Sequence, residues 1–189
     1  MANRSGRCPV AAPALLPRLA VWYLGTLVPV IGLGQLLVQM GQVDDGILQF
    51  RQALTHKPDD FFAHNNLGTA LGGKGQLDEA ISHFQAAVKL NPEEAEAFSN
   101  LGLALSMKGR VDEAIPCYRE AIGLKPDYAK AYKNLGVALV RKGQLEEAIT
   151  QFEQAVRLQP NYTDAQHFLA AARAQQQARS HPSPPPAKP

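Results

Sequence analysis

The chain has little cysteine, few aromatic residues and no excess of charge of one sign. Cys8 and Cys117, the two cysteines among 189 residues, have no cysteine or histidine partner at ligand spacing, which excludes a disulfide scaffold and a structural zinc site. The 19 Lys and Arg residues nearly balance 17 Asp and Glu residues, so we expect no nucleic-acid partner, because phosphates require a basic stripe. The 46% hydrophobic content suffices for a packed core.

A period of 34 residues is the strongest pattern in the sequence. Two glycine columns, two leucine columns and single columns of aromatic residues, alanine and proline share this spacing. The columns are Gly34, Gly68, Gly102 and Gly136; Gly41, Gly75, Gly109 and Gly143; Leu33, Leu67, Leu101 and Leu135; Leu37, Leu71, Leu105 and Leu139; Phe50, Phe84, Tyr118 and Phe152; Ala53, Ala87, Ala121 and Ala155; and Pro58, Pro92, Pro126 and Pro160.

Each period predicts two helices. In residues 61–74 the apolar positions follow helical spacing, and Gly75 then ends the helix. In residues 77–90 the apolar residues lie at i, i+3, i+4 and i+7, which places them on one stripe of a helix. Because one such helix cannot bury its stripe alone, the pattern predicts an all-α stack of helix pairs.

These motifs resemble the tetratricopeptide repeat: Asn66-Leu67-Gly68, Gly75, Asp78-Glu79-Ala80-Ile81, Phe84, Ala87 and Asn91-Pro92, with the same pattern in the next two periods. The resemblance implies an α-solenoid, a right-handed superhelix of helix-turn-helix repeats. We expect a degenerate repeat at 27–60, in which Gly46 replaces the alanine of the other repeats. The remaining expected units are a basic and apolar segment at 1–26, repeats at 61–94, 95–128 and 129–162, a capping helix at 163–179 and an extended, disordered proline-rich tail at 180–189.

Asn66, Asn100 and Asn134 form a candidate ladder on the inner face of the solenoid. Equivalent residues of successive repeats stand roughly 10 Å apart, about one helix-packing distance. An amide offers a donor and an acceptor, so the ladder could pair with the backbone of an extended peptide. Similar repeat proteins use the equivalent asparagines on peptides, which the resemblance implies here. The alternative is that these amides make only local hydrogen bonds.

The neighbours of this ladder would set specificity. Lys130 and Lys133 are three residues apart on one helix face, and Arg141 lies about two turns further on, so the third repeat favours an acidic segment or a free C-terminal carboxylate. The alternative is an ordinary solvated basic face. If the family's inner-face positions carry over, the groove residues are Phe62, Asn65, Thr69, Leu103, Ser106, Lys130, Lys133, Val137 and Arg141. Chaperone-binding members have Lys and Asn where this chain has Asn65 and Thr69, which argues against chaperone-tail recognition.

No motif predicts catalysis. Residues 68–75 nearly spell a phosphate-binding P-loop, but Gly75 replaces the magnesium-holding hydroxyl, and the stretch falls inside a predicted helix. The five histidines show no metal-ligand spacing and no neighbouring nucleophile. We therefore predict a non-enzymatic protein-interaction module without cofactor or metal.

The N-terminal third allows two interpretations. Residues 19–43 carry no charge and follow Arg4, Arg7 and Arg18, so residues 19–38 are long enough to span a bilayer, which would leave residues 44–58 as a half-repeat. The second half of this run also fits the repeat register, as the first helix of the degenerate repeat, and leaves the protein cytoplasmic. Residues 23–33 resemble a segment of bacterial multi-pass glycosyltransferases with C-terminal tetratricopeptide repeats. That resemblance implies an alternative function: the repeat part or remnant of a membrane protein-glycosylation system.

The two interpretations of residues 19–43 predict different fractionation. If the run anchors the chain, the full-length protein stays in the membrane pellet after an alkaline carbonate wash, because about 20 apolar residues hold a span in the bilayer. A chain beginning at Asp44 is the control and should leave the pellet. Recovery of the full-length chain in the soluble fraction would decide for the repeat helix.

Overall fold

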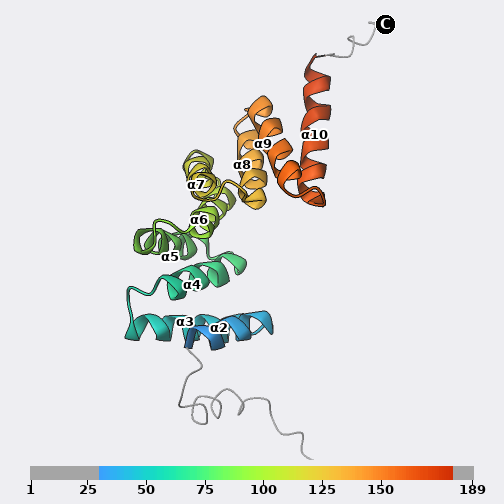
Figure 1. Ribbon diagram of the computed structural model, residues 1–189. Coiled ribbons are helices and arrows are strands. Elements are labelled where there is room, and N and C mark those ends of the chain that lie inside the picture. The colour runs from blue at the N-terminus through green and yellow to red at the C-terminus, as the bar shows by residue number, and fades with distance from the viewer. Residues whose placement is uncertain (1–29, 181–189) are drawn as a thin grey trace, which may run out of the picture.

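A computed structural model describes residues 30–180 and contains only helices in that range. Figure 1 shows them as a stack of pairs that ends with α10. The predicted all-α solenoid of helix pairs with a C-terminal capping helix is confirmed. The helices are α2 (Val30–Gln39), α3 (Val43–His56), α4 (Phe61–Gly73), α5 (Leu77–Leu90), α6 (Ala95–Met107), α7 (Val111–Leu124), α8 (Ala129–Arg141), α9 (Leu145–Leu158) and α10 (Thr163–Ser180).

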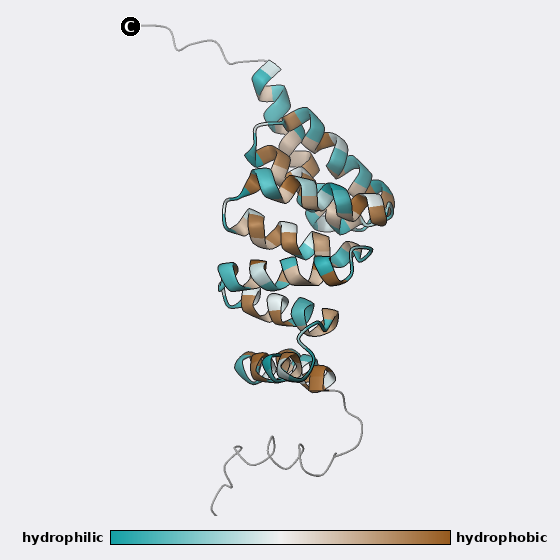
Figure 2. Cartoon of the chain, turned by 90° about the vertical axis from the view of Figure 1, so that its left-hand side faces the viewer, coloured by the Kyte–Doolittle hydropathy of each residue, from teal (hydrophilic) through white to brown (hydrophobic). Residues whose placement is uncertain are grey.

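The helices alternate between an inner and an outer layer. The first helices of the repeats, α2, α4, α6 and α8, each contact the first helix that follows, and α8 also contacts α10. Within residues 30–180 the second helices α3, α5, α7 and α9 make no such contacts with one another. The first helices therefore line the closer-packed, concave face. Figure 2 shows hydrophobic and hydrophilic residues mixed along each helix, as amphipathic packing requires.

A close contact between a glycine and an aromatic ring joins the two helices of each repeat. A Cβ atom added at the glycine would lie only 2.5 to 2.9 Å from a ring carbon in the second helix. The ring side chains are buried, so the two backbones approach each other across a flat ring face. The four pairs are Gly34 with Phe50, Gly68 with Phe84, Gly102 with Tyr118, and Gly136 with Phe152.

A second glycine column makes the turn between the two helices. Gly75 has a φ of 75°, a left-handed conformation that only glycine adopts without strain. The backbone N–H of Gln76 then donates to the carbonyl oxygen of Leu71 at 3.0 Å, and Gly75 N–H donates to Gly72. This pattern satisfies the last carbonyls of α4 and ends the helix. Gly41, Gly109 and Gly143 repeat it.

The degenerate first repeat folds as a complete helix pair. Leu37 is buried, and a Cβ at Gly46 would lie 2.5 Å from Val38 Cγ2. The glycine thus makes room for a valine where α4 has Gly72 opposite Ala80. A span over residues 19–38 would leave residues 44–58 as a half-repeat, whereas in the described structure α2 pairs with α3.

Parts of the predictions for both ends of the chain lie outside the described residues. This holds for the segment 1–26, for residues 19–29 of the uncharged run and for residues 181–189 of the predicted tail, while Ser180 ends α10. Among residues 30–180, no helix combines the length and the apolarity that crossing a membrane requires.

Ion pairs link the outer edges of neighbouring repeats. Lys142 Nζ lies 2.6 Å from Asp112 Oδ1, and Lys74 pairs with Asp44 and Lys108 with Asp78 in the same way. The aspartates also lie in the first turns of their helices, where negative charge favours the helix dipole. All are exposed, so each pair contributes at most about 1 kcal/mol, and burial holds the stack together.

The glycine–ring contact predicts a sharp difference between two alanine substitutions. Gly102→Ala places a methyl group about 2.8 Å from a carbon of the buried Tyr118 ring and should lower the free energy of unfolding by about 1 to 3 kcal/mol. Gly123→Ala in α7 meets no atom within 4 Å and should raise it by about 0.5 to 1 kcal/mol, through helix propensity. Urea unfolding followed by circular dichroism measures both. Equal effects would refute the proposed close contact.

Candidate peptide-binding groove

The candidate site is the inner face formed by α4, α6 and α8, which carry the predicted groove residues. Phe62, Thr69 and Leu103 are exposed there, with Phe62 64% exposed. Asn65 and Val137 are half-buried. Ser106 was expected to line the groove, but its side chain is buried.

Two members of the asparagine ladder join neighbouring repeats. Asn66 Oδ1 accepts from Gln35 Nε2 of α2 at 3.4 Å. Asn100 Nδ2 donates to Asn65 Oδ1 of α4 at 3.3 Å. The local hydrogen bonds of the alternative interpretation are therefore present, and both Asn66 and Asn100 also border cavities that open on the groove. Peptide contact by these two amides remains a prediction.

Asn134 departs from the expected ladder. It is only 6% exposed, and its Nδ2 atom is buried without a hydrogen-bond partner among the described residues. The serine hydroxyl of Ser99, also buried and unpartnered, occupies in α6 the place that Asn65 has in α4. Serine is shorter than asparagine, which explains why the inter-repeat bond of Asn100 is not repeated. Asn134 is thus buried where Asn66 and Asn100 are half-buried, and its contact with a peptide remains a prediction.

The basic cluster of Lys130, Lys133 and Arg141 lies on the inner side of α8. Lys130 is exposed, and none of the three forms an ion pair within residues 30–180. Burial lowers the pKa of Lys133, Asp164 partly offsets this effect, and Lys130 lowers the pKa further. Lys133 and Lys130 thus repel each other where an anion would relieve the repulsion.

Arg141 is positioned by the preceding repeat. Its Nη1 donates to the backbone oxygen of Ser106 at 2.8 Å and to the Ser106 hydroxyl at 3.1 Å. These bonds satisfy a carbonyl at the end of α6 and occupy one guanidinium nitrogen. The other guanidinium N–H groups make no hydrogen bond within the described chain, so Arg141 keeps donors for an anionic ligand.

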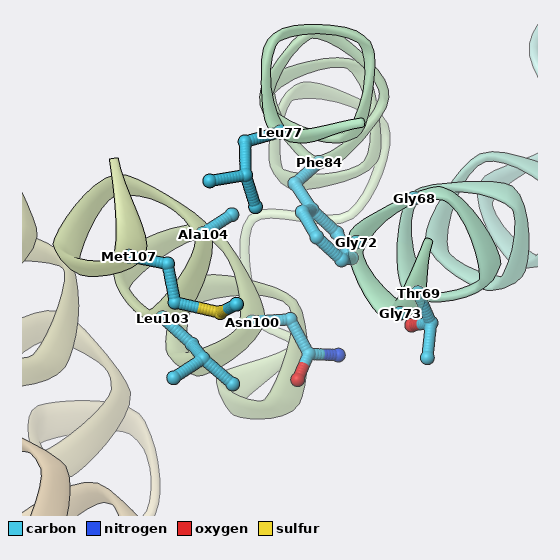
Figure 3. Close-up of a pocket in the computed structure, with 10 residues that line it drawn as sticks. All are labelled: Gly68, Thr69, Gly72, Gly73, Leu77, Phe84, Asn100, Leu103, Ala104 and Met107. Carbon is cyan, nitrogen blue, oxygen red and sulfur yellow. The ribbon is translucent and has the colours of Figure 1, made fainter. Parts of the chain in front are cut away.

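Three cavities lie in equivalent places at the junctions of α2 with α4, α4 with α6 and α8 with α10, and the sequence pattern did not predict them. Each has an aromatic ring of the glycine–ring contacts in its wall: Phe50, Phe84 or Phe152. Their volumes are about 270 Å³ between α2 and α4, about 210 Å³ between α4 and α6, and about 380 Å³ between α8 and α10. Figure 3 shows the second, which we name the glycine pocket because Gly72 and Gly73 form one wall.

Cys117 and the pair of His64 and His83 form no catalytic arrangement with one another among the described residues. Burial raises the pKa of Cys117 to about 11, so its thiol is protonated at neutral pH. His64 Nδ1 lies 2.9 Å from His83 Nδ1, and His64 Nε2 lies 2.9 Å from the carbonyl oxygen of Pro58. The Pro58 carbonyl oxygen can only accept, so Nε2 of a neutral His64 carries the hydrogen and donates to it. His64 Nδ1 then accepts from the N–H at His83 Nδ1, and the two bonds hold both rings in place. No three His, Cys, Asp or Glu residues within 30–180 could hold a metal.

The histidine pair was missed from the sequence because its members lie 19 residues apart on different helices. Burial and the neighbouring His64 lower the pKa of His83, while Glu79 acts in the opposite direction. The pair packs between α4 and α5, away from the groove face of α6 and α8.

Solved structures with the same fold support the architecture. A crystal structure of MamA is 26% identical, covers 78% of this chain and 86% of its own, and superposes with a TM-score of 0.72. YrrB, described as a TPR protein with an unusual peptide-binding site, is 22% identical, with 86% and 84% coverage and a TM-score of 0.69. PilF of Pseudomonas aeruginosa is 23% identical, with 80% and 69% coverage and a TM-score of 0.73.

Sequence comparison identifies the family. No curated protein sequence matches the chain. The family model described as tetratricopeptide repeat matches residues 31–95, 65–129, 100–163 and 133–179, in overlapping two-repeat windows. These windows span every described helix pair and most of α10. The chain therefore belongs to the tetratricopeptide repeat family.

Proposed function

We propose that the chain is a non-catalytic protein-interaction module that binds an extended peptide along the inner face of α4, α6 and α8. Members of this family generally act as interaction modules, and YrrB has a peptide-binding site. At 22% identity YrrB supports only the fold, so the proposal is argued from this chain's own residues. The observation that carries it is the combination, on one concave face, of open cavities, amides at their edges and cations that form no ion pair with the described residues.

The amides suit a peptide backbone. Asn100 uses its Nδ2 on Asn65, and its Oδ1 has no hydrogen bond within the described residues, so the oxygen is available to a peptide N–H. Asn66 likewise accepts one long bond from Gln35 and keeps its Nδ2 donors. A backbone bound in this way is recognised without reading its side chains, as in other modes of extended-peptide recognition.

The charges favour an acidic segment over the third repeat. Glu96 of α6 occupies the same column as Lys130 of α8, so the charge at this edge changes sign from the second repeat to the third. A carboxylate placed over α8 would meet Lys130, Lys133 and the free guanidinium nitrogens of Arg141, and would avoid Glu96. A free C-terminal carboxylate and an acidic side chain share this chemistry.

No observation on residues 30–180 favours the glycosyltransferase-associated alternative, which remains a prediction from residues 23–33. Membrane association of the segment before α2 also remains a prediction, with the cytoplasm as the alternative location.

Selection from a phage-displayed library of random dodecapeptides on the immobilised full-length chain tests the function. We expect enriched peptides to contain Asp, Glu or a required free C-terminus. Asn100→Ala should weaken their binding by about 1 to 3 kcal/mol, because a peptide group loses its partner. Lys130→Glu should weaken it by about 1 kcal/mol at low salt and less at high salt. Calorimetry with synthetic peptides measures both.

The control is Lys89→Glu, which reverses an exposed charge on the second helix α5. It should leave affinity unchanged, and circular dichroism should show that all three variants keep their helicity. If the library yields no peptide above background, or if Lys89→Glu weakens binding as much as Lys130→Glu, the proposed function is wrong.

A further inference from the structure

The last turn of α4 differs from the equivalent turn of every other first helix in the repeats. Two successive positions there border the junctions with neighbouring helices, and in α4 both are glycine, so these two positions present backbone alone. The other helices present larger side chains. The two columns read Val38 and Gln39 in α2, Gly72 and Gly73 in α4, Ser106 and Met107 in α6, and Val140 and Arg141 in α8.

The missing side chains leave open space rather than a closer helix contact. A Cβ atom at Gly73 would meet no atom within 4 Å, and one at Gly72 would meet only Ala80 Cβ, at 3.9 Å. The equivalent inter-helix space between α6 and α8 is bridged by Arg141, which bonds to Ser106. Between α4 and α6 lies the glycine pocket, with a volume of about 210 Å³, whose wall at Gly72 and Gly73 is backbone alone.

The walls of the glycine pocket are apolar. In Figure 3, Leu77 and Phe84 reach it from α5, while Leu103 and Met107 reach it from α6. Leu103 is 38% exposed and Met107 55% exposed, which is costly for large apolar side chains beside a concave surface. The Asn100 amide lies opposite Leu77, at the polar edge of the pocket.

We propose that the glycine pocket holds one aliphatic or aromatic side chain of the bound peptide and so acts as the anchor site of the groove. This inference rests on the proposed function. An engineered apolar cavity of about 150 Å³ accepts benzene, so the pocket has room for a Leu, Met or Phe side chain. Asn100 Oδ1 at the edge would accept the backbone N–H beside the anchor, which aligns the peptide along the groove.

The position of the basic cluster completes the description of the partner. The pocket lies between α4 and α6, and the cluster lies on α8, which is about one and a half helix spacings, or roughly 15 Å, further along. An extended chain covers this distance in about four or five residues. The partner is therefore an extended segment with an apolar anchor and a carboxylate four or five residues away.

Filling the pocket tests the proposal. The probe is a synthetic dodecapeptide selected from the library, together with its analogue in which the apolar anchor is replaced by serine. On the wild-type chain the serine analogue should bind at least tenfold more weakly. Gly73→Leu should weaken the parent peptide at least tenfold and abolish the difference between the two peptides, because its side chain occupies the anchor space.

Gly123→Leu in α7 is the matched control, since Gly123 is also helical and also has no atom within 4 Å of an added Cβ. It should bind both peptides as the wild type does. If the Gly73→Leu variant loses helicity, the Leu103→Gln variant is used in its place. The Leu103 side chain is already partly exposed, so this substitution should not disturb the fold.

The possible results separate the two proposals. If peptides bind but neither the serine analogue nor Gly73→Leu changes affinity more than twofold, the anchor site is wrong and the groove function stands. If the chain selects no peptide, both fall. If Gly123→Leu weakens binding as much as Gly73→Leu, the effect is not pocket filling and the anchor site is again refuted.

Discussion

The contact between a small inner-helix residue and a flat aromatic ring sets the geometry of the whole chain. At Gly34, Gly68, Gly102 and Gly136 the missing Cβ lets a ring lie directly against the backbone. This fixes the distance between the helices of a repeat, and repetition of the contact at 34-residue intervals produces the stack. Three of the four rings also form part of a cavity wall, so the same side chains build the core and the groove.

The repeats share their core and differ in their junctions. The columns that pack inside a repeat hold almost the same residues four times, whereas the two columns at the ends of the first helices hold glycine, serine, valine, glutamine, methionine or arginine. Arg141 bonds across to Ser106 at the junction of α6 with α8, and Gly72 and Gly73 contribute backbone alone to the wall of the glycine pocket. Stability depends on the shared columns and recognition on the variable ones, which agrees with a site placed on a common fold.

The sequence predicted the fold well because the period itself encodes it. Seven columns at one spacing define helices, turns and the contacts between them, and even the degenerate first repeat follows, since Gly46 is compensated by Val38. The site was predicted less completely. Asn134 lacks the inter-repeat bond of Asn100 because the adjacent first helix has Ser99, and the bonds of Arg141 depend on Ser106, 35 residues away. Such pairs appear only when the columns of neighbouring repeats are aligned in space.

The glycine pocket illustrates what a motif search overlooks. Residues 68–75 resemble an incomplete P-loop. Their predicted helix is present up to Gly73, and the turn follows at Gly75. The pocket is indicated by aligning the four repeats. Among the first helices α2, α4, α6 and α8, α4 alone has two adjacent glycines at positions where the others have larger side chains. An absence of side chains is visible in the sequence, but the space it leaves depends on how closely the next helix packs.

The most direct measurement of the central claim, that a peptide binds on the inner face at the glycine pocket, uses methionine methyl groups. The chain has three methionines, of which Met107 borders the pocket, whereas Met40, 65% exposed, lies in the turn between α2 and α3 and does not line the pocket. With ¹³C-methyl methionine, a titration with a selected peptide should shift the Met107 signal and leave Met40 unchanged. A saturating peptide that shifts Met40 alone, or neither residue, would contradict the account.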